Sequence, residues 1–242
     1  MKKRKIVIKI IEFLFFIILL LSSYKLLNYT KDTKENKNIL DNLSKSVKIN
    51  KKDNKLVVNF DELKKINSDT IAYIKINNNN IDYPVVKTND NDFYLNHNFE
   101  KKSNSGGWIF ADYKNNFDGN DRNIVIYGHN MKNKSMFGTL SKTLTSEFQN
   151  NENNLIITLV TNEKEYKYKI FSTYRIENEE YYIKTNFASD NEYIEFLSTI
   201  KKRSNKYFDV SLDEKDQILT LSTCANNNNR IVVHAKKEKE NE

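Results

Sequence analysis

The amino-acid sequence predicts a mainly β protein: a closed or nearly closed barrel of eight strands with a few peripheral helices, preceded by an N-terminal transmembrane helix. Eight short segments rich in β-branched and aromatic residues are bounded by Asn, Asp and Gly, a pattern typical of strands and turns. Helical spacing recurs in few places. A mostly antiparallel sheet of this size must protect its edges, and closure into a barrel does so.

The chain begins with a basic cluster and then a long apolar run. K-K-R-K is followed by mainly apolar residues from Ile6 to Leu27, about the ~20 residues that a helix needs to cross a bilayer. A cleavable signal peptide is the alternative, but no A-x-A-like cleavage site follows Leu21. We therefore expect an uncleaved signal anchor, with the basic cluster in the cytoplasm and Lys31 onward outside the cell membrane.

Composition divides the chain into three expected parts. Residues 1–29 form the basic end and the anchor, residues 30–55 form a stalk or loosely helical spacer rich in Lys, Asn and Asp, and residues 56–242 form the barrel domain. Residues 1–29 hold six basic residues and one acidic residue, so the other 33 basic and 31 acidic residues give the rest a formal charge of +2. This nearly neutral body argues against a nucleic-acid partner.

The expected elements follow in chain order. Phe60, Leu63 and Ile66 recur at helical spacing and predict a short amphipathic helix. A further helix is expected after the capping box S-D-N-E at residues 189–192, and a short one at residues 135–144. The apolar stripe of the later helix consists of Tyr193, Phe196, Leu197 and Ile200. The expected strands cover residues 70–76, 81–86, 108–111, 123–127, 155–160, 166–174, 217–224 and 230–236.

The chain contains a single cysteine, Cys224. Exported domains usually use cysteines in disulfide pairs, which one cysteine cannot form within its own chain. The thiol is therefore free, part of an intermolecular bridge, or a catalyst. The alternative is a buried cysteine that acts as a small hydrophobic residue.

The register of the last two strands distinguishes these uses. They are joined by residues 225–229, a connection of ordinary hairpin length. With Cys224 opposite Arg230, the cysteine lies on the face away from the apolar residues, which weakens the hydrophobic alternative. That face also carries the pairs Ser222 with Val232 and Thr220 with His234, whereas the core face carries Leu219, Leu221, Ile231 and Val233.

An arginine and a histidine would complete a cysteine acyl-transfer site. A fixed cation such as Arg230 stabilises a thiolate or an oxyanion, although a surface arginine is the ordinary alternative. A proton carrier is also needed, usually histidine. His234 lies along the sheet from the Cys224 position, roughly 13 Å away at ~3.3 Å per residue, which is too far for direct proton transfer. His97 lies in a polar loop or helix end. His129 follows an apolar strand beside Gly128, so it is the candidate, against the alternative of a satisfied loop histidine.

Other uses of these residues fit less well. One cysteine and three histidines with no short-spaced ligand pair do not indicate a zinc site, so we expect neither metal nor organic cofactor. The papain-type signature C-G-S-C-W is absent from the sequence.

Three motifs together resemble the sortases, the membrane-anchored cysteine transpeptidases of Gram-positive bacteria. They are Y-G-H-N at residues 127–130, T-L-S-T-C at 220–224 and R-I-V-V-H-A-K at 230–236. The serine in T-L-S-T-C and the stretches I-D-Y-P-V-V and M-F-G-T-L are similar to class B. The resemblance extends from about Ile66 to Lys236, and the connection A-N-N-N-N between cysteine and arginine is shorter than is usual in the family.

The resemblance implies an eight-stranded sortase-like barrel and a set of roles. Its catalytic residues would be Cys224 as nucleophile, His129 as general acid and base, and Arg230 as the group that steadies substrate or oxyanion. Its substrate-binding residues would be Asn91, Tyr182, Ser222 and Thr223. Such an enzyme cleaves a C-terminal sorting motif, N-P-x-T-like or P-x-T-G-like, after its threonine through a thioester. The implied partners are surface proteins that bear this signal and a peptidoglycan precursor amine.

Two alternatives remain open at this point. A pilin-polymerising sortase would use an amine on a protein as acceptor. A non-catalytic barrel would only bind cell-surface proteins.

Overall fold

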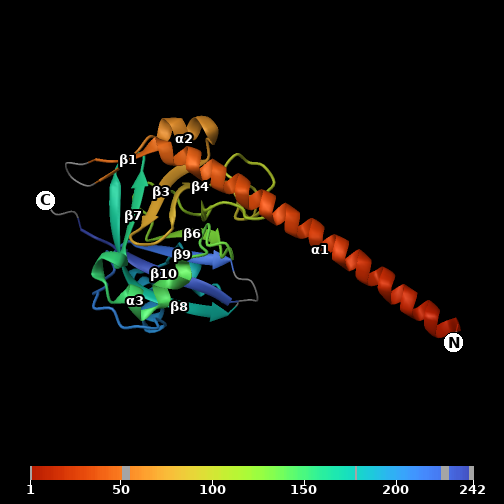
Figure 1. Ribbon diagram of the computed structural model, residues 1–242. Coiled ribbons are helices and arrows are strands. Elements are labelled where there is room, and N and C mark those ends of the chain that lie inside the picture. The colour runs from red at the N-terminus through yellow and green to blue at the C-terminus, as the bar shows by residue number, and fades with distance from the viewer. Residues whose placement is uncertain (1, 51–54, 178, 225–228, 240–242) are drawn as a thin grey trace.

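The computed structural model describes residues 2–50, 55–177, 179–224 and 229–239. Eight strands close into a barrel in the order β10-β8-β7-β3-β4-β5-β6-β9 (Figure 1). The predicted fold class is therefore confirmed. The barrel strands are β3 (Thr70–Ile76), β4 (Asp82–Val86), β5 (Phe110–Ala111), β6 (Asn123–His129), β7 (Ile156–Thr161), β8 (Glu165–Glu177), β9 (Ile218–Cys224) and β10 (Asn229–Lys237).

The barrel is antiparallel except at two places. β4 pairs with β5 and β6 pairs with β9 in parallel. Parallel neighbours need a long crossover, and here the chain between β6 and β9 contributes two more barrel strands before it returns. The parallel β6–β9 pair brings the ends of two strands, far apart in sequence, to the same side of the barrel.

Side chains from alternate strand positions fill the barrel interior. On β9 and β10 the inward residues are Leu219, Leu221, Ile231 and Val233, all at most 1% exposed. These are the residues that the sequence places on the core face. Burial of such side chains is worth roughly 1.5–3 kcal/mol each.

The outside of β8, β9 and β10 is covered as well. Helix α4 (Asp190–Lys202) is capped by Ser189, whose Oγ accepts the backbone N–H of Glu192 at 3.2 Å, which is one half of the predicted capping box. The short 3₁₀ helix η5 (Tyr181–Ile183) lies before it. The apolar stripe of α4 is buried and forms a second core with outward side chains of these strands, Val232 among them.

Helix α1 (Lys2–Leu43) extends far from the barrel at its N-terminal end and packs against it at its C-terminal end (Figure 1). Apolar side chains between residues 6 and 27 are exposed, and this part is long and apolar enough to be a candidate membrane span. Near the other end Ile39 and Leu43 join the main core. The Nδ2 group of buried Asn36 donates to Asn104 Oδ1 at 2.9 Å. Helix α1 thus continues to Leu43, within residues 30–55, predicted as a stalk or loosely helical spacer. The division of the chain into three parts stays a prediction.

The remaining elements are short. Helix α2 (Phe60–Ile66) confirms the predicted amphipathic helix, with Phe60 and Leu63 buried and Ile66 exposed. Residues 135–144 differ from the prediction, because helical structure starts only at η3 (Leu140–Leu144) and the left-handed backbone of Met136 does not fit a right-handed helix. The others are η1 (Ser44–Ser46), β1 (Val47–Ile49), β2 (Leu56–Val58), η2 (Phe93–Leu95), α3 (Ser146–Gln149) and η4 (Glu152–Leu155).

Candidate active site

The parallel pairing of β6 and β9 brings the predicted histidine and cysteine together. His129 is the Cα partner of Cys224, and Gly128 and Tyr127 are the partners of Thr223 and Ser222. Neighbouring strands lie about 4.8 Å apart. Both residues are the last of their strands, so their backbones lie side by side at the same end of the barrel.

The β9–β10 register agrees with the prediction from sequence. Ser222 pairs with Val232, and Thr220 pairs with His234. The predicted five-residue connection falls on residues 225–229, of which residues 225–228 lie outside the described part of the chain. Arg230 follows on β10, on the other side of that connection.

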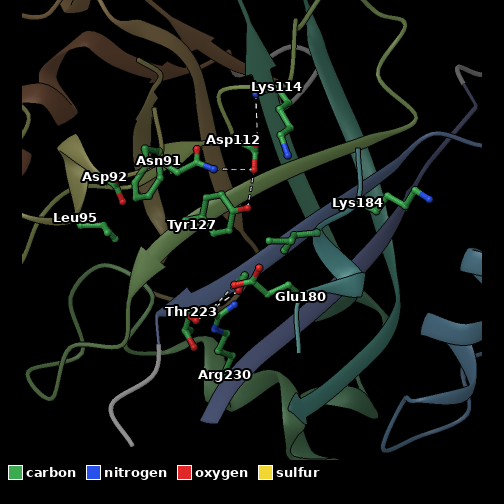
Figure 2. A pocket seen from close by; sticks show the side chains of 13 residues that line it. Asn91, Asp92, Leu95, Asp112, Lys114, Tyr127, Glu180, Lys184, Thr223 and Arg230 are labelled. Atoms are coloured by element: carbon green, nitrogen blue, oxygen red, sulfur yellow. Dashed lines mark hydrogen bonds and ion pairs between the residues drawn. The ribbon is translucent and has the colours of Figure 1, made fainter. Parts of the chain in front are cut away.

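A cavity of about 670 Å³ opens beside this edge. Four predicted site residues line it: Asn91, Ser222, Thr223 and Arg230. Figure 2 shows Thr223 and Arg230 at one end of the cavity, with Asn91, Asp112 and Tyr127 toward the other. Further lining residues that the sequence did not single out are Asp92, Leu95, Phe110, Lys114, Glu180, Ile183 and Lys184.

The half-buried His129 has one ring nitrogen committed to the backbone. Its Nε2 lies 2.6 Å from the carbonyl oxygen of Leu95 at the end of η2. A carbonyl only accepts hydrogen bonds, so Nε2 must carry the proton. In the neutral imidazole the free lone pair is therefore on Nδ1. No local sequence pattern indicates this role of Leu95.

Arg230 is held at the cavity by its neighbours from the η5 region. Its Nη1 donates to the Tyr182 hydroxyl at 3.3 Å, and its Nη2 lies 3.6 Å from Glu180 Oε1. The Tyr182 hydroxyl also bonds Ser222 Oγ at 2.9 Å. Tyr182 itself is fully buried, so it reaches the cavity through these two partners and not by its own surface.

Thr223 has a structural bond beside the nucleophile position. Its Oγ1 accepts the backbone N–H of Ile231 at 2.9 Å, and the residue is 1% exposed. This bond connects the ends of β9 and β10 across the strand pair, so it fixes the backbone on which the next residue, Cys224, lies.

The opposite end of the cavity contains a buried carboxylate that the sequence analysis missed. Asp112 is 3% exposed and accepts from the Tyr127 hydroxyl at 2.7 Å and from Asn91 Nδ2 at 3.0 Å, both on Oδ2. Burial and the Asp112 charge raise the pKa of Tyr127 far above its ordinary value, so it remains a neutral phenol. Asp112 lies just after a strand in A-D-Y-K, a position common for functional polar residues, but that signal alone is weak.

The other two histidines have different surroundings from His129. His97 stacks on Phe93 with ring centroids 4.0 Å apart. His234 is fully buried on the outer face of β10, where burial lowers the pKa of its imidazole to about 3. Among the described residues no three His, Cys, Asp or Glu side chains gather into a possible metal site.

Comparisons with known proteins agree with this geometry. Residues 74–238 match the family model of the sortase domain. Sortase B of Staphylococcus aureus is 32% identical over 233 residues, which cover 94% of this chain and 95% of that protein. Sortase B of Listeria monocytogenes is 36% identical over 168 residues, or 67% of this chain, and the match spans 65% of the relative's length.

A solved structure gives the same result. The crystal structure of sortase B from Bacillus anthracis in complex with AAEK1 superposes with a TM-score of 0.78 at 33% identity, covering 87% of this chain and all of that one. Sequence motifs, barrel topology and overall likeness thus converge, and the chain belongs to class B of the sortases, a family of cysteine transpeptidases.

Proposed function

We propose that this chain cleaves a C-terminal sorting motif of the N-P-x-T or P-x-T-G type after its threonine, through a thioester on Cys224. The acyl group then passes to an amine of a peptidoglycan precursor on the outer side of the membrane. Helix α1 anchors the barrel domain on that side. The observation that carries the proposal is the in-register pairing of His129 with Cys224 beside a cavity that Arg230 lines.

The first half-reaction forms the thioester. The Cys224 thiolate attacks the carbonyl carbon of the threonine, and the guanidinium of Arg230 stabilises the thiolate beforehand and the oxyanion as it develops. The C–N bond then breaks, and the leaving amine takes a proton from Nδ1 of the His129 imidazolium, because Nε2 is committed to Leu95.

The second half-reaction transfers the acyl group. The acceptor amine attacks the thioester, loses a proton to Nδ1 of His129, and releases Cys224 as thiolate when the C–S bond breaks. Water in place of the amine gives hydrolysis, so cleavage is measurable without an acceptor. Exclusion of water and correct positioning of the amine then decide the yield of transfer.

The test uses the full chain in detergent with fluorogenic peptides that carry each motif. We expect cleavage after threonine, with a loss of on the order of 10³-fold or more in kcat/KM for Cys224→Ala. His129→Ala should lose about 10²–10⁴-fold, and Arg230→Ala about 10²–10³-fold. His97→Ala and Arg203→Ala are the matched controls, since the ring of His97 stacks on Phe93 and Arg203 pairs with Glu179, and the proposed mechanism uses neither residue.

Two further measurements separate the alternatives. Intact-mass spectrometry should detect an acyl-enzyme that hydroxylamine removes, and this adduct should be absent in Cys224→Ala. Competition between a peptidoglycan-precursor amine and a lysine-bearing protein distinguishes a cell-wall acceptor from pilin polymerisation. Peptide binding without turnover or adduct in the wild-type chain would show a binding module and contradict the proposal.

A further inference from the structure

The buried carboxylate of Asp112 has three hydrogen-bond donors around it. Oδ1 accepts the backbone N–H of Lys114 at 2.9 Å. Oδ2 accepts the Tyr127 hydroxyl and the Asn91 amide, and Figure 2 shows both of these side chains directed at it. Three donors thus converge on one carboxylate, a group that only accepts hydrogen bonds when it is ionised.

This carboxylate fixes what Tyr127 offers to the cavity. The single hydroxyl proton of Tyr127 is directed at Asp112, so the phenol oxygen has only lone pairs left for a ligand. Burial and the nearby negative charge raise the pKa of Tyr127, which keeps that proton in place. Tyr127 therefore faces the cavity as an acceptor.

The same carboxylate fixes the amide of Asn91. Its Oδ1 accepts the backbone N–H of Tyr113 at 3.0 Å, while one Nδ2 proton goes to Asp112. Two independent partners thus determine the orientation of the amide, and the second Nδ2 proton remains as a donor. This end of the cavity presents one fixed acceptor and one fixed donor, backed by a negative charge.

The position of the cluster indicates which part of a substrate reaches it. Thr223, the neighbour of the nucleophile, lines the cavity with Arg230 at one end, and the Asp112 cluster lies toward the other (Figure 2). In the proposed function, a peptide whose threonine carbonyl lies at Cys224 would place its upstream residues along this cavity. Lys114 also lines this region, with its ammonium 5.5 Å from the Tyr113 ring centroid.

We propose that Asp112 is a positioning residue that sets the hydrogen-bonding polarity of Asn91 and Tyr127, and through them selects the side chain at the first position of the sorting motif. The proposal rests on the proposed function. A neutral side chain with both an N–H donor and an acceptor matches the fixed pair. An isosteric carboxylate lacks the donor for Tyr127 and meets the charge of Asp112.

The test measures kcat and KM of the full chain in detergent on three peptides that differ only at the first motif position: Asn, Asp or Ala. In the wild type we expect the Asn peptide to be preferred over the Asp peptide. Asp112→Asn should raise KM for the Asn peptide about tenfold with little change in kcat. It should lower the ratio of kcat/KM for the Asn peptide to kcat/KM for the Asp peptide. It should change kcat/KM for the Ala peptide less than about twofold.

Two variants make the result decisive. Asp121→Asn is the matched control, because Asp121 accepts the backbone N–H groups of Asn116 and Phe117 in the same β5–β6 connection but does not line the cavity. It should leave the three-peptide ratios unchanged. Tyr127→Phe removes the acceptor and keeps the charge, and it should lower kcat/KM for the Asn peptide alone, even if Asp112→Asn does not fold.

The outcomes separate the two proposals. If the wild-type chain cleaves none of the peptides and forms no acyl-enzyme, the proposed function fails. If the wild type cleaves normally but Asp112→Asn and Tyr127→Phe reduce all three peptides equally, Asp112 has only a structural role and the inference is overturned.

Discussion

The two faces of the β9–β10 strand pair are both largely buried, but they differ in chemistry. The inner face is lined mainly by apolar side chains, whereas the outer face carries the polar residues Thr220, Ser222 and His234, each at most 1% exposed. Strand alternation predicts one buried and one open face, but η5 and α4 cover the outer face too. Burial alone therefore does not distinguish the two faces. Hydrogen bonding does, because every polar group that is buried on the outer face needs a hydrogen-bond partner.

The outer face meets this requirement with a directed chain of hydrogen bonds. Asn123 Oδ1 can only accept, so Thr220 donates to it at 2.7 Å, and His234 Nδ1 must in turn donate to Thr220 at 2.8 Å. His234 Nε2 then accepts the hydroxyl of Tyr174 at 2.8 Å. At its other end Asn123 Nδ2 donates to the Lys184 carbonyl at 2.9 Å, next to η5.

The largest expected effect concerns the inner face. Leu221→Ala should lower the free energy of unfolding by about 2–5 kcal/mol, because it leaves a cavity in the barrel core. Thr220→Val on the outer face keeps the shape and leaves two buried polar groups unpaired, for a loss of about 1–3 kcal/mol. Urea unfolding of both variants measures this order. A larger loss for Thr220→Val would mean that the polar face dominates stability.

The next effect is a pH dependence that belongs to the outer face alone. The pKa of His234 is lowered to about 3 in the folded chain against about 6.5 in an unfolded one. Between these values the unfolded state binds more protons, so stability falls as pH falls, by up to about 1.4 kcal/mol per pH unit from this group. Above about pH 6.5 the group adds no pH dependence.

His234→Gln isolates this contribution. The variant should lose stability at about pH 7 but show a flatter decline between about pH 6.5 and 3, measured by urea unfolding at several pH values. His97→Gln, which removes the histidine stacked on Phe93, is the control. An unchanged slope in His234→Gln would show that His234 is not held neutral in the fold.

The contrast between the faces also explains how far the fold could be predicted from the sequence. The eight strands were predictable within a few residues, because the segments alternate and end in turn residues. The β9–β10 register followed from Leu219 and Leu221. The β6–β9 contact was not predictable, because β6 ends at His129, β9 begins at Ile218, and two other barrel strands lie between them in the chain. A parallel pairing of such distant segments leaves no local pattern.

The same limit applies to the site. Cys224, His129 and Arg230 could be selected from their motifs, because each carries a recognisable chemistry within a short stretch of sequence. Asp112 and the Leu95 carbonyl could not, since each acts through a partner distant in sequence. Asp112 acts through Asn91 and Tyr127, and Leu95 acts through His129. Their roles depend on the folded arrangement and have no local signature.

The smallest expected effect tests which hydrogen bonds of the outer face affect catalysis and which affect only stability. Tyr182 and Tyr174 are both buried tyrosines on this side of the barrel. The Tyr182 hydroxyl contacts Arg230 and Ser222 at the cavity, whereas the Tyr174 hydroxyl contacts His234. Tyr182→Phe removes about 1 kcal/mol of hydrogen bonding to groups at the cavity, which corresponds to about a fivefold loss in kcat/KM.

Tyr174→Phe is the matched variant, because it deletes the same atom from a buried tyrosine whose hydroxyl bonds His234. It should lower the melting temperature and leave kcat/KM of the folded protein within about twofold, since the Tyr174 hydroxyl bonds His234 and not Arg230 or Ser222. The rate of Cys224 alkylation gives a second readout, which should fall in Tyr182→Phe alone if Tyr182 positions Arg230 beside the thiolate. Equal losses of kcat/KM in both variants would mean that the hydrogen bonds of Tyr174 and Tyr182 affect catalysis alike. Contact with Arg230 would then not explain the effect of Tyr182→Phe.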